Sequence, residues 1–352
     1  MKILVISLAG IGDTLFATPL LHELRANFPA ATIDAVVMWP GAKDLLEHNP
    51  HVNRVHQKNL IKCGRLEALN FLWSLRREGY QLSINTHPQS RIHYRIAAWL
   101  AGAPVRISHE YECFSWLDRW LVTGTLPQDY TRHAAENNLA VLPLIGAQEK
   151  LPAHGLELFL TPAEEKWADD FLARSNLAGK KWLGVHVGSG GTKNLALRRW
   201  PLENFIALSR QLQAWQKDFP VLFFGGPEEA AGHEKIRSQL ASAIFPPTKN
   251  LRQAAALLRR ARGFLSVDTA LMHVAAAMKV PAQMVIETPT WNRPIEPFGN
   301  PFTLIKNPAV AGRGLDFYRY DGGDIKGTRE ELLACMASVK VADVLATVKQ
   351  CF

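Results

Sequence analysis

The stretch KILVISLAGIGDTLFATPLLHELRANFPAATIDAVVM, residues 2–38, decides the fold class. An apolar run from Lys2 to Leu8 leads into a turn with two glycines. A segment with apolar residues at helical spacing follows and stops before a proline, and a second apolar run covers Thr32 to Met38. Strand, helix and strand in this order predict a parallel βαβ unit.

The same alternation continues along the chain and restarts after Gly179. Two successive α/β series predict two Rossmann-like, doubly wound parallel-sheet domains that face each other across a cleft. We expect a first domain at residues 1–176, with residues 162–176 as a connector helix, and a second domain at 177–327. Helices within 328–352 are expected to pack back onto the first domain.

The composition is that of a globular chain of two domains. It has 352 residues, of which 47% are hydrophobic and 20% charged, so there is enough apolar surface to exclude intrinsic disorder. No run of about 18 apolar residues is present, and Asp13 interrupts the apolar N-terminus, which disfavours a signal peptide. Four cysteines lie far apart without a CxxC pair, which argues against disulfides and zinc and favours a reducing compartment.

The charge is unevenly distributed. The formal net charge is +8. Between His51 and His133 the sequence has eleven Lys and Arg but only six Asp and Glu, a local excess of five positive charges. Such a surface attracts the phosphates of nucleic acid, an anionic membrane or a phosphorylated acceptor, and it is also compatible with a merely solvated face. No aromatic–basic recognition motif accompanies the charge, so nucleic acid is the least favoured partner.

The first of four candidate motifs is GIGDTLFATP, which follows the first strand. Its glycines allow a tight turn, but Leu15 stands where a dinucleotide fingerprint needs its third glycine. Asp13 occupies the position of a helix N-cap, and that structural role is as compatible with the sequence as a catalytic one. In the catalytic reading, its carboxylate takes a proton from an incoming hydroxyl.

The second motif is HVGSGGTKNLALRRWP, residues 186–201. Its small residues leave backbone N–H groups accessible, and Lys193, Arg198 and Arg199 add positive charge. The motif therefore fits a pyrophosphate cradle, with a plain loop as the alternative. It lacks the GK[ST] ending of a Walker loop, which disfavours a P-loop ATPase.

The third and fourth motifs are SVDTALMHVAAA (266–277) and FFGGPEE (223–229). In the third, Asp268 or Thr269 caps a helix whose first free N–H groups favour an anion, and a histidine follows one turn later that is either a ligand or a half-buried core residue. In the fourth, Glu229 either accepts hydrogen bonds from ribose hydroxyls or begins a solvated helix. Each of the four motifs follows the carboxyl end of an expected parallel strand, the edge at which doubly wound sheets bind ligands.

Taken together, the four motifs and the late segment CMASVKVADVLATV (335–348) resemble the heptosyltransferases of glycosyltransferase family 9. The resemblance covers most of the chain. It implies a GT-B fold with the acceptor in the first domain and the nucleotide-sugar donor in the second. It also implies inverting transfer of a heptose from ADP-L-glycero-β-D-manno-heptose to the inner core of lipopolysaccharide.

The resemblance also implies roles for individual residues. Asp13 matches the catalytic base, and no cofactor or metal is implied, since a basic cradle replaces the metal. The implied donor-binding residues are Ser189, Gly190, Arg198, Glu229, Asp268, Thr269, Ala270, Leu271 and His273, and Lys193 joins them because of its charge in the same loop. The chain departs from the family at Thr288-Pro289-Thr290-Trp291, where many relatives carry G-P-T-[DE] near the donor sugar.

Given the resemblance, the basic stretch is expected to hold a phosphorylated, lipid-linked acceptor at the cytoplasmic face of the inner membrane, with peripheral membrane contact. Its expected residues are Lys58, Lys62, Arg65, Arg91 and Arg95. Two alternatives remain: transfer of another sugar by the same fold, and a non-catalytic protein that binds a nucleotide sugar or an anionic lipid. A pure binding protein has no need of a carboxylate at position 13.

Overall fold

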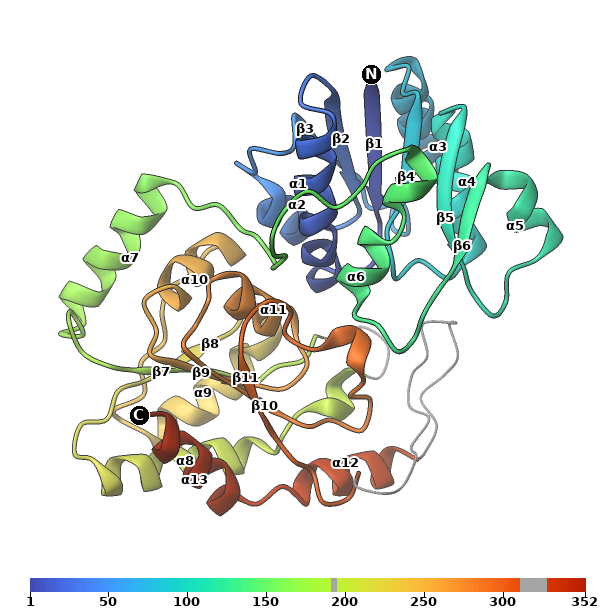
Figure 1. The fold of residues 1–352 in the computed structure, drawn as a ribbon. Coiled ribbons are helices and arrows are strands. Elements are labelled where there is room, and N and C mark those ends of the chain that lie inside the picture. Colours follow the sequence, from blue (N-terminus) through green and yellow to red (C-terminus); the bar gives the residue numbers. More distant parts are fainter. Residues whose placement is uncertain (191–194, 311–327) are drawn as a thin grey trace. The chain divides into compact units, whose positions relative to one another are not determined.

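The computed structural model describes residues 1–190, 195–310 and 328–352, which divide into two compact units (Figure 1). Unit 1 contains Met1–Phe159 and Arg293–Phe298, and unit 2 contains Leu160–Asn292 and the described residues from Gly299 onward. The expected boundary after residue 176 is therefore wrong. Residues 162–176 belong to unit 2, and residues 293–298 return to unit 1, where His133 Nε2 lies 2.8 Å from the Glu296 carbonyl oxygen.

Unit 1 is built on a six-stranded parallel sheet in the order β3-β2-β1-β4-β5-β6. The strands are β1 (Lys2–Ser7), β2 (Thr32–Val37), β3 (Arg54–Gln57), β4 (Leu82–Asn85), β5 (Val105–Glu110) and β6 (Gly124–Pro127). The helices are η1 (Gly12–Ala17), α1 (Thr18–Asn27), α2 (Pro40–Leu46), α3 (Arg65–Arg77), α4 (Ile92–Ala101), α5 (Trp116–Leu121), α6 (Ala134–Leu139) and η2 (Leu142–Ile145).

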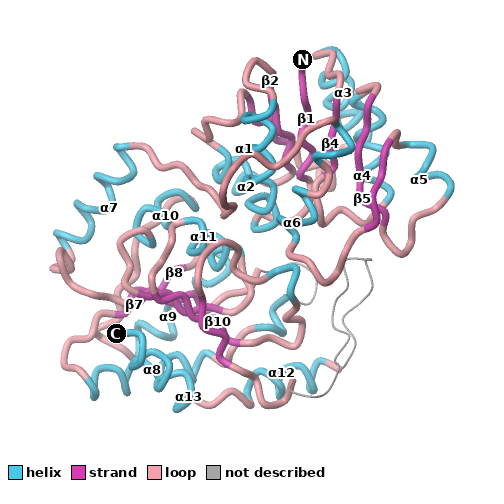
Figure 2. The backbone as a smooth tube through the Cα atoms, viewed as in Figure 1, coloured by secondary structure: helices cyan, strands magenta, loops and turns pink. Residues whose placement is uncertain are grey.

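Helices cover both faces of this sheet, as the continuous apolar run of β1 requires. Successive side chains of a strand point to opposite faces. Leu4 and Ile6 accordingly share a core with Leu72 of α3, while Ile3 and Val5 share the other core with residues of α1, α2 and η2. Figure 2 shows the strands in magenta with cyan helices beside them. The predicted βαβ unit at residues 2–38 is confirmed.

Unit 2 is built on a five-stranded parallel sheet in the order β11-β10-β9-β7-β8. The strands are β7 (Leu183–His186), β8 (Val221–Phe224), β9 (Gly263–Ser266), β10 (Ala282–Ile286) and β11 (Phe302–Ile305). The helices are α7 (Pro162–Arg174), η3 (Leu195–Arg198), α8 (Leu202–Trp215), η4 (Pro227–Glu229), α9 (Ala230–Gln239), α10 (Leu251–Leu258), α11 (Ala270–Ala277), α12 (Arg329–Ala337) and α13 (Val341–Cys351); η5 (Arg293–Ile295) lies in unit 1. Both predicted α/β series are thus present.

The C-terminal helices α12 and α13 belong to unit 2, so the expectation that they pack onto the first domain is wrong. Met336, Val344 and Val348 are buried in the same core as strands β8 and β10. The Trp200 indole nitrogen donates a hydrogen bond of 2.9 Å to the Val339 carbonyl oxygen between the two helices. These helices therefore complete the core of unit 2.

An ion pair between α7 and α10 makes the stability of unit 2 sensitive to acid. Glu164 accepts hydrogen bonds from Arg252 Nε at 2.5 Å and Nη2 at 2.8 Å. Burial alone would raise the pKa of Glu164, but the bonds from Arg252 and from Thr161 lower it from 4.5 to about 2. A depressed folded-state pKa stabilises the protein fully above the unfolded pKa, and the contribution disappears as the pH falls through the folded pKa.

We therefore expect the Glu164 contribution to disappear between about pH 4.5 and 2. Glu164→Gln should flatten this part of the stability–pH curve, as measured by denaturant unfolding. Glu165→Gln, at the more exposed neighbour that pairs with Arg259, is the matched control and should keep the wild-type slope. The same slope in Glu164→Gln and wild type would contradict the assignment.

Candidate active site

The loops that carry the predicted donor residues leave the same edge of the unit 2 sheet. Strand β7 pairs in parallel with β8 on one side and with β9 on the other, which makes β7–β9 the point where the chain order reverses. Ligands of doubly wound sheets bind at such a point, outside the carboxyl ends of the strands. Ser189 follows β7, Glu229 follows β8 and Thr269 follows β9, so the expected common edge is confirmed.

Helix α11 begins directly after β9, and Thr269 is its N-cap. The Thr269 hydroxyl accepts a hydrogen bond of 3.3 Å from the Met272 N–H, which decides between the two capping residues that the sequence allowed. His186 at the end of β7 lies 3.2 Å from the same hydroxyl. Burial lowers the pKa of His186 to about 3, so this ring is neutral near pH 7. The sequence analysis missed His186, which connects the end of β7 to the start of α11.

The α11 N-terminus keeps backbone N–H groups available for an anion. Ala270 and Leu271 form its first turn together with the buried His273, and the positive end of the helix dipole lies there. An anion placed at this turn would meet N–H groups that have no partner within the helix.

Arg198 and Asp268, which were predicted separately, form an ion pair next to this turn. Their side chains are only 9% and 10% exposed, so the charges are largely withdrawn from water. Burial raises the pKa of Asp268, and the positive charge of Arg198 opposes that rise. The Asp268 carboxylate therefore holds the guanidinium at the carboxyl end of β9.

Arg199 connects the loops after β7 and β8; the sequence placed its charge in the phosphate cradle, but the resemblance did not include it among the donor-binding residues. Its guanidinium donates to the Ser189 hydroxyl at 3.3 Å and to the Gly190 carbonyl oxygen at 3.3 Å, and it lies 3.7 Å from Glu229 Oε1. Glu229 in turn accepts a 2.8 Å hydrogen bond from the Gly226 N–H. In the sequence, the signal for this residue was its position as the second arginine of the RRWP segment, residues 198–201.

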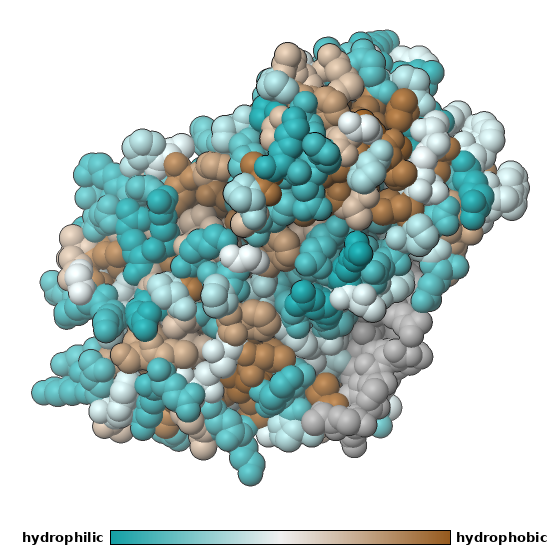
Figure 3. All heavy atoms as spheres, in the orientation of Figure 1, coloured by the Kyte–Doolittle hydropathy of each residue, from teal (hydrophilic) through white to brown (hydrophobic). Residues whose placement is uncertain are grey.

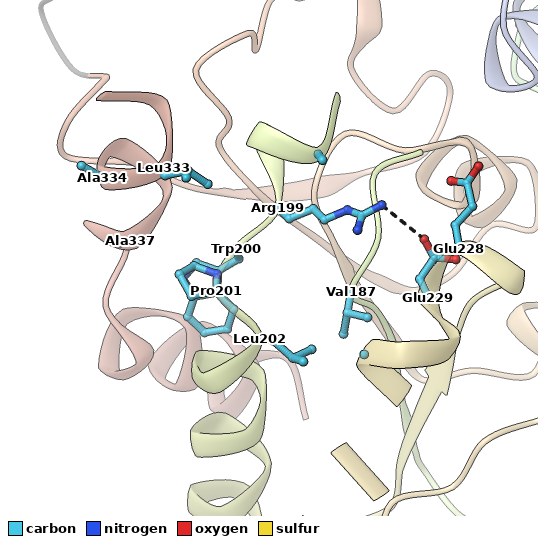
Figure 4. Close-up of a pocket in the computed structure, with 12 residues that line it drawn as sticks. Val187, Arg199, Trp200, Pro201, Leu202, Glu228, Glu229, Leu333, Ala334 and Ala337 are labelled. Atoms are coloured by element: carbon cyan, nitrogen blue, oxygen red, sulfur yellow. Dashed lines mark ion pairs between the residues drawn. The ribbon is translucent and has the colours of Figure 1, made fainter. Parts of the chain in front are cut away.

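Arg199 and Glu229 also line a pocket of about 540 Å³ within unit 2 (Figure 4). In the close-up their side chains point toward each other across the dashed ion pair, and Glu228 lies beside Glu229. The other walls are apolar and include Val187, Trp200 and residues of α12. A charged pair beside an apolar wall is a typical lining of a small-molecule site.

The turn after β10 contains the departure from the family pattern. Thr288 and Thr290 are buried, with their hydroxyl oxygens 3.3 Å apart, and the Trp291 N–H donates to the Thr288 carbonyl oxygen at 3.0 Å. Because β10 pairs with β9, this turn follows the strand next to the α11 loop. Hydroxyl and indole groups stand here in place of a glycine and an acid.

Asp13 lies in unit 1 after β1, on the 3₁₀ helix η1. The N-cap position belongs to Ile11, so the interpretation of Asp13 as the N-cap is wrong. Its Oδ2 instead accepts a 2.7 Å hydrogen bond from the Gly10 N–H. A Cβ at Gly10 would stand 2.8 Å from the same oxygen, so the glycine makes room for the partly exposed carboxylate.

The predicted acceptor residues divide into exposed and buried ones. Lys62, Arg65 and Arg91 are exposed, and Lys58 pairs with Glu67. Arg95 is only 1% exposed and forms an ion pair with Asp118 of α5. The prediction of Arg95 as an acceptor contact is wrong, because its guanidinium is buried inside unit 1, where it binds the Asp118 carboxylate.

Two further points complete the comparison with the sequence. Lys193 lies outside the described residues.

Among the residues that the structure describes, one group has the composition of a metal site, namely His22, His51 and Glu157, whose ligand atoms lie within 4.8 Å of one another. The two imidazole rings stack at 3.9 Å and Glu157 lies 2.8 Å from His22 Nδ1, so the carboxylate already has a hydrogen-bond partner within the group. This group belongs to unit 1, whereas the donor loops belong to unit 2.

Two parallel-sheet α/β units, one of them with phosphate-compatible loops at its switch point, define the GT-B class of glycosyltransferases. A profile of glycosyltransferase family 9 (heptosyltransferase) matches residues 69–299. The chain therefore belongs to glycosyltransferase family 9, and it is a glycosyltransferase.

Individual relatives agree with this assignment. The chain is 25% identical over 295 residues to lipopolysaccharide heptosyltransferase 3 of Escherichia coli, covering 77% of this chain and 78% of the relative. A family 9 glycosyltransferase from Veillonella parvula has the same fold, with a TM-score of 0.78 at 21% identity over 99% of this chain and 96% of the other. The E. coli heptosyltransferase WaaC, solved with ADP-2-deoxy-2-fluoro heptose, gives 0.70 at 18% identity over 99% of each chain.

Proposed function

We propose that this enzyme transfers a heptose from ADP-L-glycero-β-D-manno-heptose to a hydroxyl of the lipopolysaccharide inner core, with inversion at the anomeric carbon. The observation that carries the donor assignment is the convergence of Ser189, Glu229 and the α11 N-terminus at one sheet edge. A heptosyltransferase of the same fold has been solved with an ADP-heptose analogue, which supports this choice of donor.

In the proposed reaction, each group of the donor has a partner. The α11 N–H groups of Thr269, Ala270 and Leu271 bind a phosphate, and Arg198 stabilises the negative charge that grows on the departing diphosphate. The Ser189–Gly190 loop approaches the phosphates, and Glu229 accepts hydrogen bonds from the ribose hydroxyls. Cationic and N–H partners suffice for this charge, so the reaction is proposed to need no metal ion.

Asp13 is the proposed general base. It takes the proton of the acceptor hydroxyl while that oxygen forms a bond to the anomeric carbon. The bond from this carbon to the diphosphate oxygen breaks on the opposite face and leaves ADP. The transition state has oxocarbenium character, as in glycoside hydrolysis.

The acceptor is proposed to be phosphorylated and lipid-linked, with Lys58, Lys62, Arg65 and Arg91 as its partners. Lys62, Arg65 and Arg91 are exposed cations that attract acceptor phosphates, and Lys58 is shared with Glu67. The enzyme is then a cytoplasmic protein that associates peripherally with the inner membrane. No helix in the described part of the chain is long and apolar enough to cross a membrane.

The experiment that tests the proposal is ADP release from ADP-heptose in the presence of deacylated core acceptor and EDTA. Release that depends on the acceptor and resists EDTA is the expected result. ADP binding without release would favour a non-catalytic nucleotide-sugar or anionic-lipid binding protein. Release only with another nucleotide sugar would favour a different donor, the alternative to which the Thr288–Trp291 turn points.

Gly188→Ala should weaken donor binding, because Gly188 leaves room for the Glu229 carboxylate. A Cβ at Gly188 would stand 2.1 Å from Glu229 Oε1, so Gly188→Ala must displace this carboxylate from Arg199. We expect ADP to bind about tenfold more weakly by calorimetry, since about 1.4 kcal/mol of ribose and loop contacts is lost.

Gly226→Ala is the matched control. A Cβ there would lie 3.9 Å from Glu229 Oε2, which is an ordinary contact. The backbone N–H of residue 226, which donates a hydrogen bond to Glu229, is retained. It should bind ADP like the wild type. Equal affinities of Gly188→Ala and wild type would contradict the role of Glu229.

A further inference from the structure

Helix α3 carries two apolar stripes, and only one of them is buried. Leu72 and Leu75 lie in the core of unit 1. Leu66, Leu69 and Trp73 recur at i, i+3 and i+7 and are 78%, 49% and 52% exposed. An apolar stripe with helical spacing normally packs against something. The second stripe is therefore a surface that the described part of the chain leaves uncovered.

Three more tryptophans extend this stripe over the neighbouring helices. Trp99 of α4 is 38% exposed, and Trp116 and Trp120 of α5 are 79% and 60% exposed. The rings of Trp99 and Trp120 lie 5.5 Å apart. We call the surface formed by Leu66, Leu69, Trp73, Trp99, Trp116 and Trp120 the aromatic face.

Arg76 joins the two halves of the aromatic face. Its guanidinium lies over the Trp73 ring, 5.4 Å from the ring centre. Its Cγ stands 2.7 Å from the place of a Cβ on Gly102, which ends α4 three residues after Trp99. The stripe of α3 and the tryptophans of α4 and α5 thus form one continuous surface.

The tryptophans of α5 stand on an element that is held rigidly. Asp118 pairs with Arg95 of α4, and it also accepts a 2.8 Å hydrogen bond from the Ser115 N–H in a capping box. The short helix is therefore anchored through its buried side, while Trp116 and Trp120 project outward. Two large apolar rings that stay in contact with water are unfavourable, and burying them against a partner would be favourable.

Positive charge surrounds the aromatic face. From Lys62 to Arg77 the chain has four Lys and Arg and one acid, Glu67, which is paired with Lys58. Arg119 of α5 adds a guanidinium whose side chain is 67% exposed and which lies 3.6 Å from Glu110 Oε1. Indole rings within a cationic rim complement a partner surface that is both apolar and negatively charged.

We propose that the aromatic face docks onto the surface of an anionic lipid bilayer. Indole rings favour the headgroup level of a bilayer, and basic side chains are attracted to anionic headgroups. Figure 3 shows the hydropathy of one face, on which brown side chains gather in patches among teal ones. Single exposed apolar side chains are normal on any folded protein, whereas four exposed tryptophans on three adjacent helices are not. The inference extends the proposed function, because a lipid-linked acceptor lies at such a surface.

A second copy of the chain is the less favoured occupant. A two-fold contact brings the same patch of both copies together, so the cations of α3 would face each other. Like charges placed across an interface oppose association. An anionic bilayer meets the same cations with opposite charge.

The test is sedimentation of the full chain with vesicles of phosphatidylcholine, with or without phosphatidylglycerol. We expect binding to the anionic vesicles only, weakened by added salt. The double variant Trp116→Ser/Trp120→Ser should bind these vesicles at least about tenfold more weakly than the wild type. Trp215→Ser removes a tryptophan of unit 2 that is 39% exposed and should bind like the wild type.

Three outcomes would overturn the proposal: equal binding of the double variant and wild type, equal loss in Trp215→Ser, or dimerisation that the double variant abolishes in sedimentation velocity. Circular dichroism of the double variant is the control for its folding. Activity on deacylated acceptor separates this inference from the proposed function. Docking can fail while soluble transfer persists, and transfer can fail while vesicle binding persists.

Discussion

Asp13→Ala should lower the turnover of ADP-heptose by about 10²–10⁴, because general-base assistance of the acceptor hydroxyl is worth that much. Binding of ADP should stay unchanged, since Asp13 lies in unit 1 and the donor loops lie in unit 2. Steady-state ADP release gives the turnover, and calorimetry gives the affinity. A fall in kcat without weaker ADP binding identifies a group that acts on the reaction rather than on the donor.

Asp13→Asn is the sharper variant, because its amide oxygen can still accept the hydrogen bond from the Gly10 N–H. The local turn is then retained while the basic oxygen is lost. We expect the same loss of turnover as in Asp13→Ala. If Asp13→Asn keeps a rate within about threefold of the wild type, the carboxylate is a structural partner of Gly10 and another group is the base.

Arg95→Met should lower the free energy of unfolding by about 3–5 kcal/mol, because it leaves the Asp118 carboxylate buried without its cation. Arg95 also donates to the carbonyl oxygens of Gln89 at 3.0 Å and Ser90 at 2.7 Å. These acceptors would lose their partner as well. Calorimetric unfolding measures the loss, and vesicle binding should weaken with it, since the pair anchors α5.

Arg91→Met, one helical turn earlier and exposed, is the matched control for stability and should change it by less than about 0.5 kcal/mol. The two variants also distinguish the structural role of Arg95 in unit 1 from the acceptor contact that the sequence analysis predicted for it. If Arg95→Met unfolds like the wild type and only raises the KM for the acceptor, its guanidinium is available to the substrate and the burial argument fails.

The strands that the sequence analysis identified are those buried on both faces. Strands such as β1, β2 and β10 read as continuous apolar runs, because helices cover both sides of the sheet. β3 reads RVHQ, β6 reads GTLP and β11 reads FTLI, and these edge strands were missed. The inner strand β5 was also missed, and its first two residues are not buried. An edge strand has less apolar surface to bury, so its pattern is weak although its backbone pairing is regular.

The C-terminal helices show the same limit at the level of domains. The segment around Val344 has clear helical periodicity, and its helix was predicted correctly. The periodicity says that one face is buried, but it does not say against which unit. The packing of Val344 and Val348 on the core of unit 2 depends on the complementary surfaces of α8 and β10.

By itself the sequence determined the alternation of strands and helices, the loops at the strand ends and the family, because periodicity, glycine turns and motif order are local properties of the chain. Only the tertiary structure decided that Arg95 is buried against Asp118, that Arg198 pairs with Asp268, and that Arg199 connects two loops. These pairs join residues 23 and 70 positions apart in the first two cases. The charge of an arginine is visible in the sequence, but its partner is set by the folded neighbourhood.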